Sequence, residues 1–144
     1  MENYNIDLIC RNIKSYDIEL KRTELNNNYS KEKHLDIKVA IDVKNSDILT
    51  EEDNNYIMMG VSIFGLDSKY DEKSIENIEN IKKDNIFYMQ CIYKISIVTD
   101  LKLDKKEYAD VAWFLLYPTL NSAISFYCNQ LKIPPICVPY RSED

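Results

Sequence analysis

Residues 111–131 carry no charged side chain, in a chain where charged residues make up 29% of the sequence. A helix needs about 20 predominantly apolar residues to cross a membrane, so the length of this stretch would suffice. Its second half, however, is rich in Asn, Ser and Gln, Pro118 interrupts it, and no cluster of basic residues flanks it. We therefore expect a helix that lies within a folded domain and does not insert into a membrane.

This predicted helix has two faces suited to burial. Spacings of three and four produce a broad apolar face made of Trp113, Leu116, Leu120, Ile124, Tyr127 and Leu131. A second face is small, polar and uncharged, and consists of Pro118, Ser122, Ser125 and Asn129. Small uncharged residues let a neighbour approach without the cost of buried charge. We expect the first face to pack on a sheet and the second to contact another copy of the chain. The alternative is a monomer whose serines face solvent.

The part of the chain before this helix has the alternation of β-strands. Residues 35–43 alternate with one apolar face, whereas residues 56–66 and 86–99 are apolar on both faces. Residues 4–22 predict one long strand with a bulge, or two short strands. Residues 69–85 predict a short amphipathic helix or turn. The whole chain, 1–144, is expected to form a single α+β domain, a four-stranded antiparallel sheet packed with one long C-terminal helix.

Composition excludes several classes of function. The net charge of −6 argues against a nucleic acid or an anionic membrane as partner. The four cysteines form no CxxC pair and the chain has one histidine, His34, so zinc spacing is absent. Without a secretion signal, the cysteines are expected to be reduced core residues of a cytoplasmic protein. Both glycines lie within a strand pattern, so no phosphate-binding loop is indicated. We expect no catalytic site, cofactor or metal.

The sheet offers a candidate binding surface. If the strand face with Ile57 and Phe87 packs on the helix, the opposite face exposes a set of apolar residues: Tyr56, Met58, Phe64, Ile86, Tyr88 and Ile92. An exposed apolar area of this kind marks an interaction site, and adaptable aromatic and Met side chains suit extended polypeptides of varied sequence. The alternative is that residues 71–85 or the N-terminal strand cover this face.

Two proline-containing runs frame the predicted helix. The first is apolar and aromatic and consists of Phe114, Leu115, Leu116, Tyr117 and Pro118; the second contains Pro134, Pro135, Ile136, Val138 and Pro139. In this order they resemble the segment that follows the sheet in SecB, the bacterial export chaperone. Residues 11–20 and 87–98 are similar to the first and last strands of that family. The resemblance covers most of the chain in order, and its specific part is the C-terminal third.

The resemblance implies a small, acidic, cytoplasmic holdase that binds unfolded polypeptides and delivers precursors to the motor SecA. It also implies a dimer of dimers with the long helices between sheets. The chain departs from the family in having no second helix after the proline-rich run, no Cys/His tail for zinc-mediated docking to SecA, and an apparent insertion at residues 71–85. We therefore expect an ATP-independent, metal-independent holdase, or a dedicated chaperone of one partner such as a toxin–antitoxin pair. A small-molecule binding domain or an enzyme is the third hypothesis.

Overall fold

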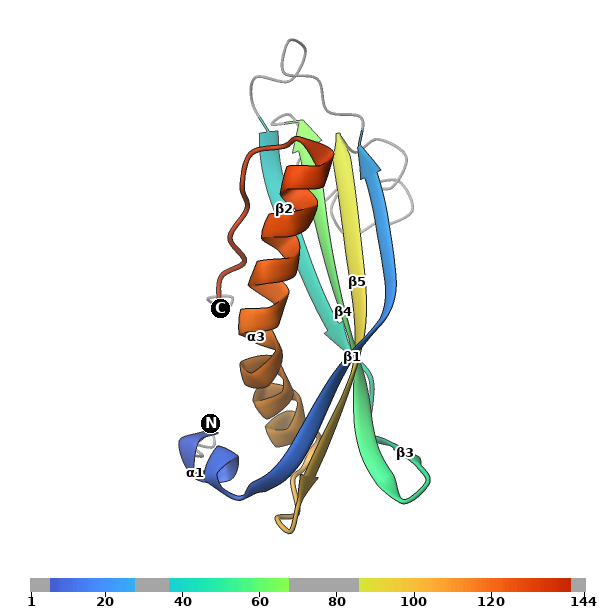
Figure 1. Ribbon diagram of the computed structural model, residues 1–144, viewed down its shortest axis with the longest axis vertical. Coiled ribbons are helices and arrows are strands. Elements are labelled where there is room, and N and C mark those ends of the chain that lie inside the picture. Colours follow the sequence, from blue (N-terminus) through green and yellow to red (C-terminus); the bar gives the residue numbers. More distant parts are fainter. Residues whose placement is uncertain (1–5, 28–36, 68–85, 141–144) are drawn as a thin grey trace.

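The computed structural model describes residues 6–27, 37–67 and 86–140 (Figure 1). In chain order the elements are α1 (Ile6–Arg11), β1 (Ile13–Asn27), β2 (Ile37–Asn45), β3 (Leu49–Glu51), β4 (Asn54–Asp67), β5 (Phe87–Thr99) and α3 (Lys105–Leu131). The described strands form one antiparallel sheet in the order β1-β5-β4-β2, and the short β3 pairs with β4. The predicted α+β architecture is confirmed, with β3 as an additional strand. His34 and the helix or turn predicted at 69–85 lie outside the described residues.

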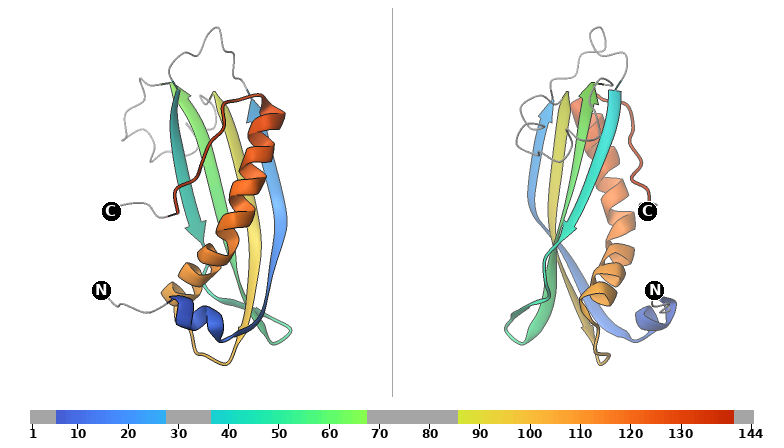
Figure 2. Two further views of the ribbon diagram at one scale, coloured as in Figure 1. Left: turned by 60° about the vertical axis from the view of Figure 1, so that its left-hand side comes forward. Right: turned by 180° about the vertical axis from the view of Figure 1, so that it is seen from behind.

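The molecule has two layers, because α3 runs along one face of the sheet (Figure 2). We call this face the inner face and the opposite one the outer face. On the inner face, Ile57 and Ile95 are fully buried, as are Leu116 and Leu120 of α3. These residues belong to one apolar cluster that extends from α1 to the chain after α3. The alternation of β4 and β5 thus places every second residue against the helix.

Helix α3 begins earlier than the uncharged stretch suggests. Asp104 and Glu107 form a capping box: the Asp104 carboxylate accepts from the Glu107 amide at 2.8 Å, and Glu107 accepts from the Asp104 amide at 3.1 Å. One turn on, the hydroxyl of Tyr108 donates to the carbonyl of Asn55 and accepts from the amide of Ile97, both at 2.9 Å. This buried hydroxyl fixes the start of α3 to both central strands.

Pro118 lies inside α3, and the helix continues beyond it to Leu131. Proline has no amide hydrogen, so it cannot donate to the carbonyl of Phe114 four residues earlier. Both residues lie on the exposed side of α3, where water can bond that carbonyl. The helix ends at Lys132, whose φ of 57° is left-handed and whose amide bonds the carbonyls of Asn129 and Cys128.

Two local expectations are corrected. The residues before Ile13, predicted to be part of a strand, form α1 instead, with Ile9 buried against the core. β1 itself is one long strand with register shifts at Ile13/Ser15 and Leu20/Arg22, as the bulged alternative predicted. The segment between β2 and β4, where no strand was predicted, contains β3. There Glu52 and Asp53, with φ of 50° and 66°, close a two-residue hairpin that usually uses Asn or Gly.

No helix within residues 6–27, 37–67 and 86–140 is long and apolar enough to cross a membrane.

Candidate functional site

The outer face is divided into a buried part and a half-buried part. Phe64 and Tyr88 are each 2% exposed, and their rings lie 5.0 Å apart in a small apolar cluster with Leu66 and Ala40. Ile86 is also buried. The predicted exposure of Phe64, Ile86 and Tyr88 is therefore wrong. Alternation placed Phe64 and Tyr88 on the correct face of the sheet, whereas Ile86 precedes β5 and belongs to the main core cluster. Alternation carries no information about how far a face is covered.

The remaining predicted residues, Tyr56, Met58 and Ile92, are half-buried on the same face. In the register of β4 with β5, Met58 lies opposite Lys94 and Gly60 lies opposite Ile92. A Cβ atom placed on Gly60 would meet only Ile92, at 3.9 Å, so the sheet is open at this point. The outer face therefore presents a shallow apolar area at the end of the sheet nearer β3.

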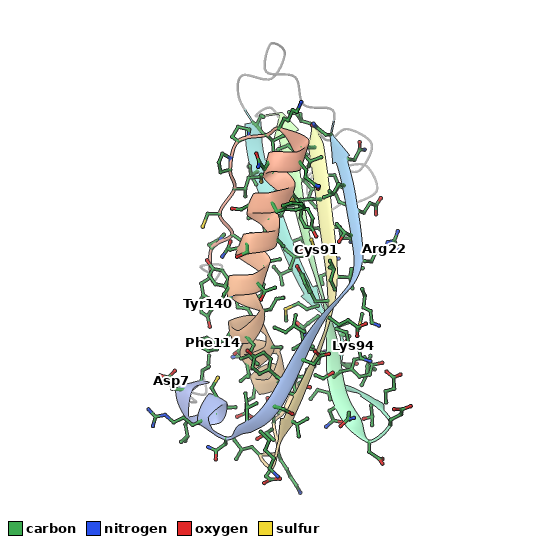
Figure 3. All side chains as sticks on the ribbon, viewed as in Figure 1. Asp7, Arg22, Cys91, Lys94, Phe114 and Tyr140 are labelled. Carbon is green, nitrogen blue, oxygen red and sulfur yellow. The ribbon has the colours of Figure 1, made fainter. Side chains whose placement is uncertain are left out.

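Charges border this area. The Lys94 ammonium lies 4.5 Å from the centre of the Tyr56 ring and 2.6 Å from the Glu51 carboxylate. The hydrogen bond from Lys94 lowers the pKa of Glu51, and the same bond raises the pKa of Lys94. Figure 3 shows Lys94 on the side of the sheet away from α3. The Lys94 charge is paired with the Glu51 carboxylate, and because the lysine side chain is only 21% exposed, its aliphatic part extends the apolar area.

The second candidate surface is the face of α3 that points away from the sheet. Pro118, Ser122, Ser125 and Asn129 are all exposed and lie along one side of the helix. Two aromatic residues that the sequence did not single out as surface residues accompany them, Phe114 at 39% and Phe126 at 58% exposure. No exposed residue of α3 between 111 and 131 is charged. This face is unlike the strand surfaces, where Lys, Glu and Asp are frequent.

The chain after α3 forms a third notable feature. Residues 133–140, which we call the strap, turn back at Lys132 and run beside α3 in extended form (Figures 1 and 2). The indole nitrogen of Trp113 donates to the carbonyl of Tyr140, and the hydroxyl of Tyr117 donates to the carbonyl of Val138 at 2.5 Å. The Val138 amide donates to the side-chain oxygen of Asn121 at 3.2 Å. The strap is therefore bonded to helix side chains.

The cysteines occupy different environments. All four are free thiols, with Cys91 and Cys128 buried, Cys10 half-buried and Cys137 exposed on the strap. The prediction that all four are core residues is wrong for Cys137. Burial raises the pKa of Cys91 to about 11, and it also raises the pKa of Cys128.

Within the described residues no three His, Cys, Asp or Glu side chains come together in a way that could hold a metal ion.

Comparison with known proteins gives a structural match alone. No family model matches the sequence, and no curated protein matches it. Among solved structures, the chain is similar to the SecB-like chaperone Rv1957 of Mycobacterium tuberculosis, solved in complex with a ChAD peptide from the antitoxin HigA1 (Rv1956). The TM-score is 0.58 at 12% identity, over 94% of this chain and 95% of that one. This protein has a SecB-like fold.

Proposed function

We propose that this protein is a polypeptide-binding chaperone that acts without ATP or a metal. The observation that carries the proposal is the SecB-like fold, matched over nearly all of both chains by a chaperone in complex with a peptide. The apolar outer face supplies the chemistry. Tyr56, Met58 and Ile92 are the residues we assign to contact with the bound polypeptide, while Phe64 and Tyr88 lie buried on the same face; Ile86 belongs to the main core cluster. The net charge of −6 favours basic segments and keeps the complex dispersed in the cytoplasm.

Two forms of this function differ in the range of bound proteins. A general holdase binds many unfolded precursors and can pass them to SecA. A dedicated chaperone binds one partner, such as an antitoxin. The dedicated chaperone is the second candidate, and it is favoured by the similar structure, Rv1957, which was solved in complex with an antitoxin peptide. Promiscuity separates the two, because a holdase slows the aggregation of unrelated proteins.

The first test is light scattering from two unrelated, chemically unfolded proteins, with this chain in slight excess and no ATP. Suppression for both supports a general holdase, and suppression for neither rejects it in favour of a dedicated partner. Met58→Asp places a charge in the apolar area and should abolish suppression. The matched control is Asn26→Asp, which adds the same charge at an exposed polar position of the outer face. Equal loss in both variants would exclude the assigned area.

We also propose that the chain forms a homo-oligomer through the exposed face of α3. Pro118, Ser122, Ser125 and Asn129 are the residues we assign to this interface, joined by Phe114. A face that is uncharged over the length of 111–131 supports the assignment, because a solvated helix face normally carries Lys and Glu. Small residues there also permit close helix approach. The native mass of the wild-type protein shows whether the oligomer contains two or four chains.

Ser125→Arg should reduce the native mass measured by size exclusion with light scattering, because a buried unpaired charge is costly. Gln130→Arg is the matched control, since it lies on the same helix but roughly 140° around the axis from Ser125. Circular dichroism checks that the sheet remains folded. An unchanged mass for Ser125→Arg would place the interface elsewhere.

A further inference from the structure

The strap is held by α3 in the way a bound peptide would be held. Trp113, Tyr117 and Asn121 are spaced four residues apart and therefore form one stripe along the helix. All three contact main-chain atoms of the strap. Main-chain atoms are common to every residue type, so these contacts place few demands on the sequence of the segment they hold.

The side chains of the strap also follow the pattern of a docked extended segment. Val138 is 1% exposed, whereas its neighbours Cys137 and Pro139 are exposed. Ile136 is half-buried against the core, and the Tyr140 ring packs edge-on against Tyr117 at 5.1 Å and Phe114 at 6.4 Å. Figure 3 shows Phe114 and Tyr140 together on this side of α3. The inward positions are thus apolar or aromatic at every second residue.

The composition of the strap prevents it from becoming part of the sheet. Pro134, Pro135 and Pro139 have no amide hydrogen, so they cannot donate to a neighbouring strand. Within the described residues, the strap follows α3 at Lys132 and is held by the helix contacts and by its inward side chains. A segment held in this manner can leave and return without breaking the sheet.

We propose that the stripe Trp113–Tyr117–Asn121, with the apolar surface beside it, is a second polypeptide-binding site that the strap occupies in cis. The ligand class is an extended segment with apolar residues at alternate positions and an aromatic residue after them. Such a segment from another polypeptide competes with the strap for this site. The inference rests on the proposed chaperone function only for the source of that segment.

The test uses the full chain and a fluorescent peptide with the sequence of residues 132–140. Val138→Asp should expel the strap while leaving the helix stripe intact. Cys137→Asp is the matched control, because it adds the same charge to the adjacent exposed residue. Fluorescence anisotropy should show the peptide binding at least 10-fold more tightly to Val138→Asp than to Cys137→Asp. Equal binding to both variants, or none to either, would overturn the proposal.

Two further variants distinguish a change at the strap site from a general loss of the fold. Tyr140→Ala removes a half-buried ring at the end of the strap and should also increase peptide affinity, by a smaller factor. Tyr117→Phe, added to Val138→Asp, removes a single hydroxyl and should weaken the peptide several-fold. If Tyr117→Phe has no effect on peptide affinity, the peptide binds elsewhere and the proposal fails. Circular dichroism of each variant shows whether α3 and the sheet are retained.

The outcome is separable from that of the aggregation assay. Peptide exchange at the helix stripe, together with no suppression of aggregation, would support the site and reject the holdase function. Suppression that Met58→Asp abolishes but Val138→Asp leaves unchanged, together with no peptide exchange, would support the function and reject this site.

Discussion

The two faces of β4 differ although they share one backbone. On the inner face Ile57, Met59, Val61 and Ile63 are at most 2% exposed along the whole strand. On the outer face burial changes along the strand, from half-buried at Tyr56 and Met58 to 2% at Phe64. The inner face is uniform because α3, α1 and the strap together complete one core cluster over it. The outer face shows that an apolar sequence of similar character can be core at one end and surface at the other.

The largest change in the free energy of unfolding is expected from truncating one of two adjacent residues of β4. Ile57→Ala removes a fully buried side chain and should destabilise the protein by about 2–5 kcal/mol. Met58→Ala, on the outer face, should cost markedly less, because its site is already in part solvated. Urea unfolding followed by circular dichroism measures both. Equal losses would mean that the outer face is as well packed as the inner one.

The rates at which thiols are modified should also distinguish buried from exposed positions. The pKa of Cys91, raised to about 11 by burial on the inner face, lowers its thiolate fraction roughly 100-fold relative to an ordinary thiol. At pH 8 iodoacetamide should therefore modify the exposed Cys137 quickly and leave Cys91 unmodified. Figure 3 places Cys91 between the sheet and α3. Intact-protein mass spectrometry with peptide mapping reports the sites, and urea should make all four react. Rapid modification of Cys91 in the native protein would contradict its burial.

The two glycines of β4 offer a matched pair, because Gly65 lies on the inner face and Gly60 on the outer. A Cβ atom on Gly65 would lie 2.0 Å from the Phe87 ring, which covers this residue. Gly65→Ala should therefore destabilise by about 1–3 kcal/mol, since the aromatic ring has to move within a packed core.

At Gly60 the added methyl meets Ile92 at an ordinary van der Waals distance. Gly60→Ala should therefore leave the free energy of unfolding unchanged or raise it by about 0.4–1 kcal/mol, because alanine gives the unfolded chain less conformational freedom than glycine. Thermal unfolding of both variants tests the pair. A large loss for Gly60→Ala would indicate that the outer face is closed at this point.

The smallest effect concerns the charges that border the outer face. Glu51→Gln breaks the exposed pair with Lys94 and should change the free energy of unfolding far less than Ile57→Ala or Gly65→Ala. Because Lys94 lowers the pKa of Glu51, the pair stabilises the fold above the ordinary pKa of the carboxyl, and this contribution disappears as pH falls through the lowered value. Urea unfolding at pH 7 and at pH 3 should show wild type losing slightly more stability than Glu51→Gln.

The sequence predicts those elements whose pattern is set by burial against a regular neighbour. The alternation of β4 and β5 and the three-four spacing of α3 arise in this way, and Leu116, Leu120 and Ile124 are in the core as expected. β2 forms where alternation predicts it, although Val39 and Val43 of its apolar face are exposed. The earlier start of α3 also had a signal, since Asp104 and Glu107 have capping-box spacing. The hairpin at Glu52 and Asp53 lacks the residues that usually mark such a turn, so β3 was missed.

The candidate sites were predicted only in part. Alternation assigned Tyr56, Met58 and Phe64 to one face correctly, but covering a face depends on contacts far away in the sequence. The stripe Trp113–Tyr117–Asn121 was also missed. Trp113 was assigned to the sheet-facing side from its spacing, and nothing in its identity shows that its indole nitrogen bonds the strap.

The order of strands in the sheet has a consequence for synthesis on the ribosome. β1 pairs with β5, and its last residue, Asn27, bonds the carbonyl of Leu131, 104 positions later. β1 therefore lacks its partner strand until β5 has been made. β2 and β4 can form a hairpin meanwhile. During synthesis, β1 therefore offers an unpaired strand edge for as long as β5 is missing.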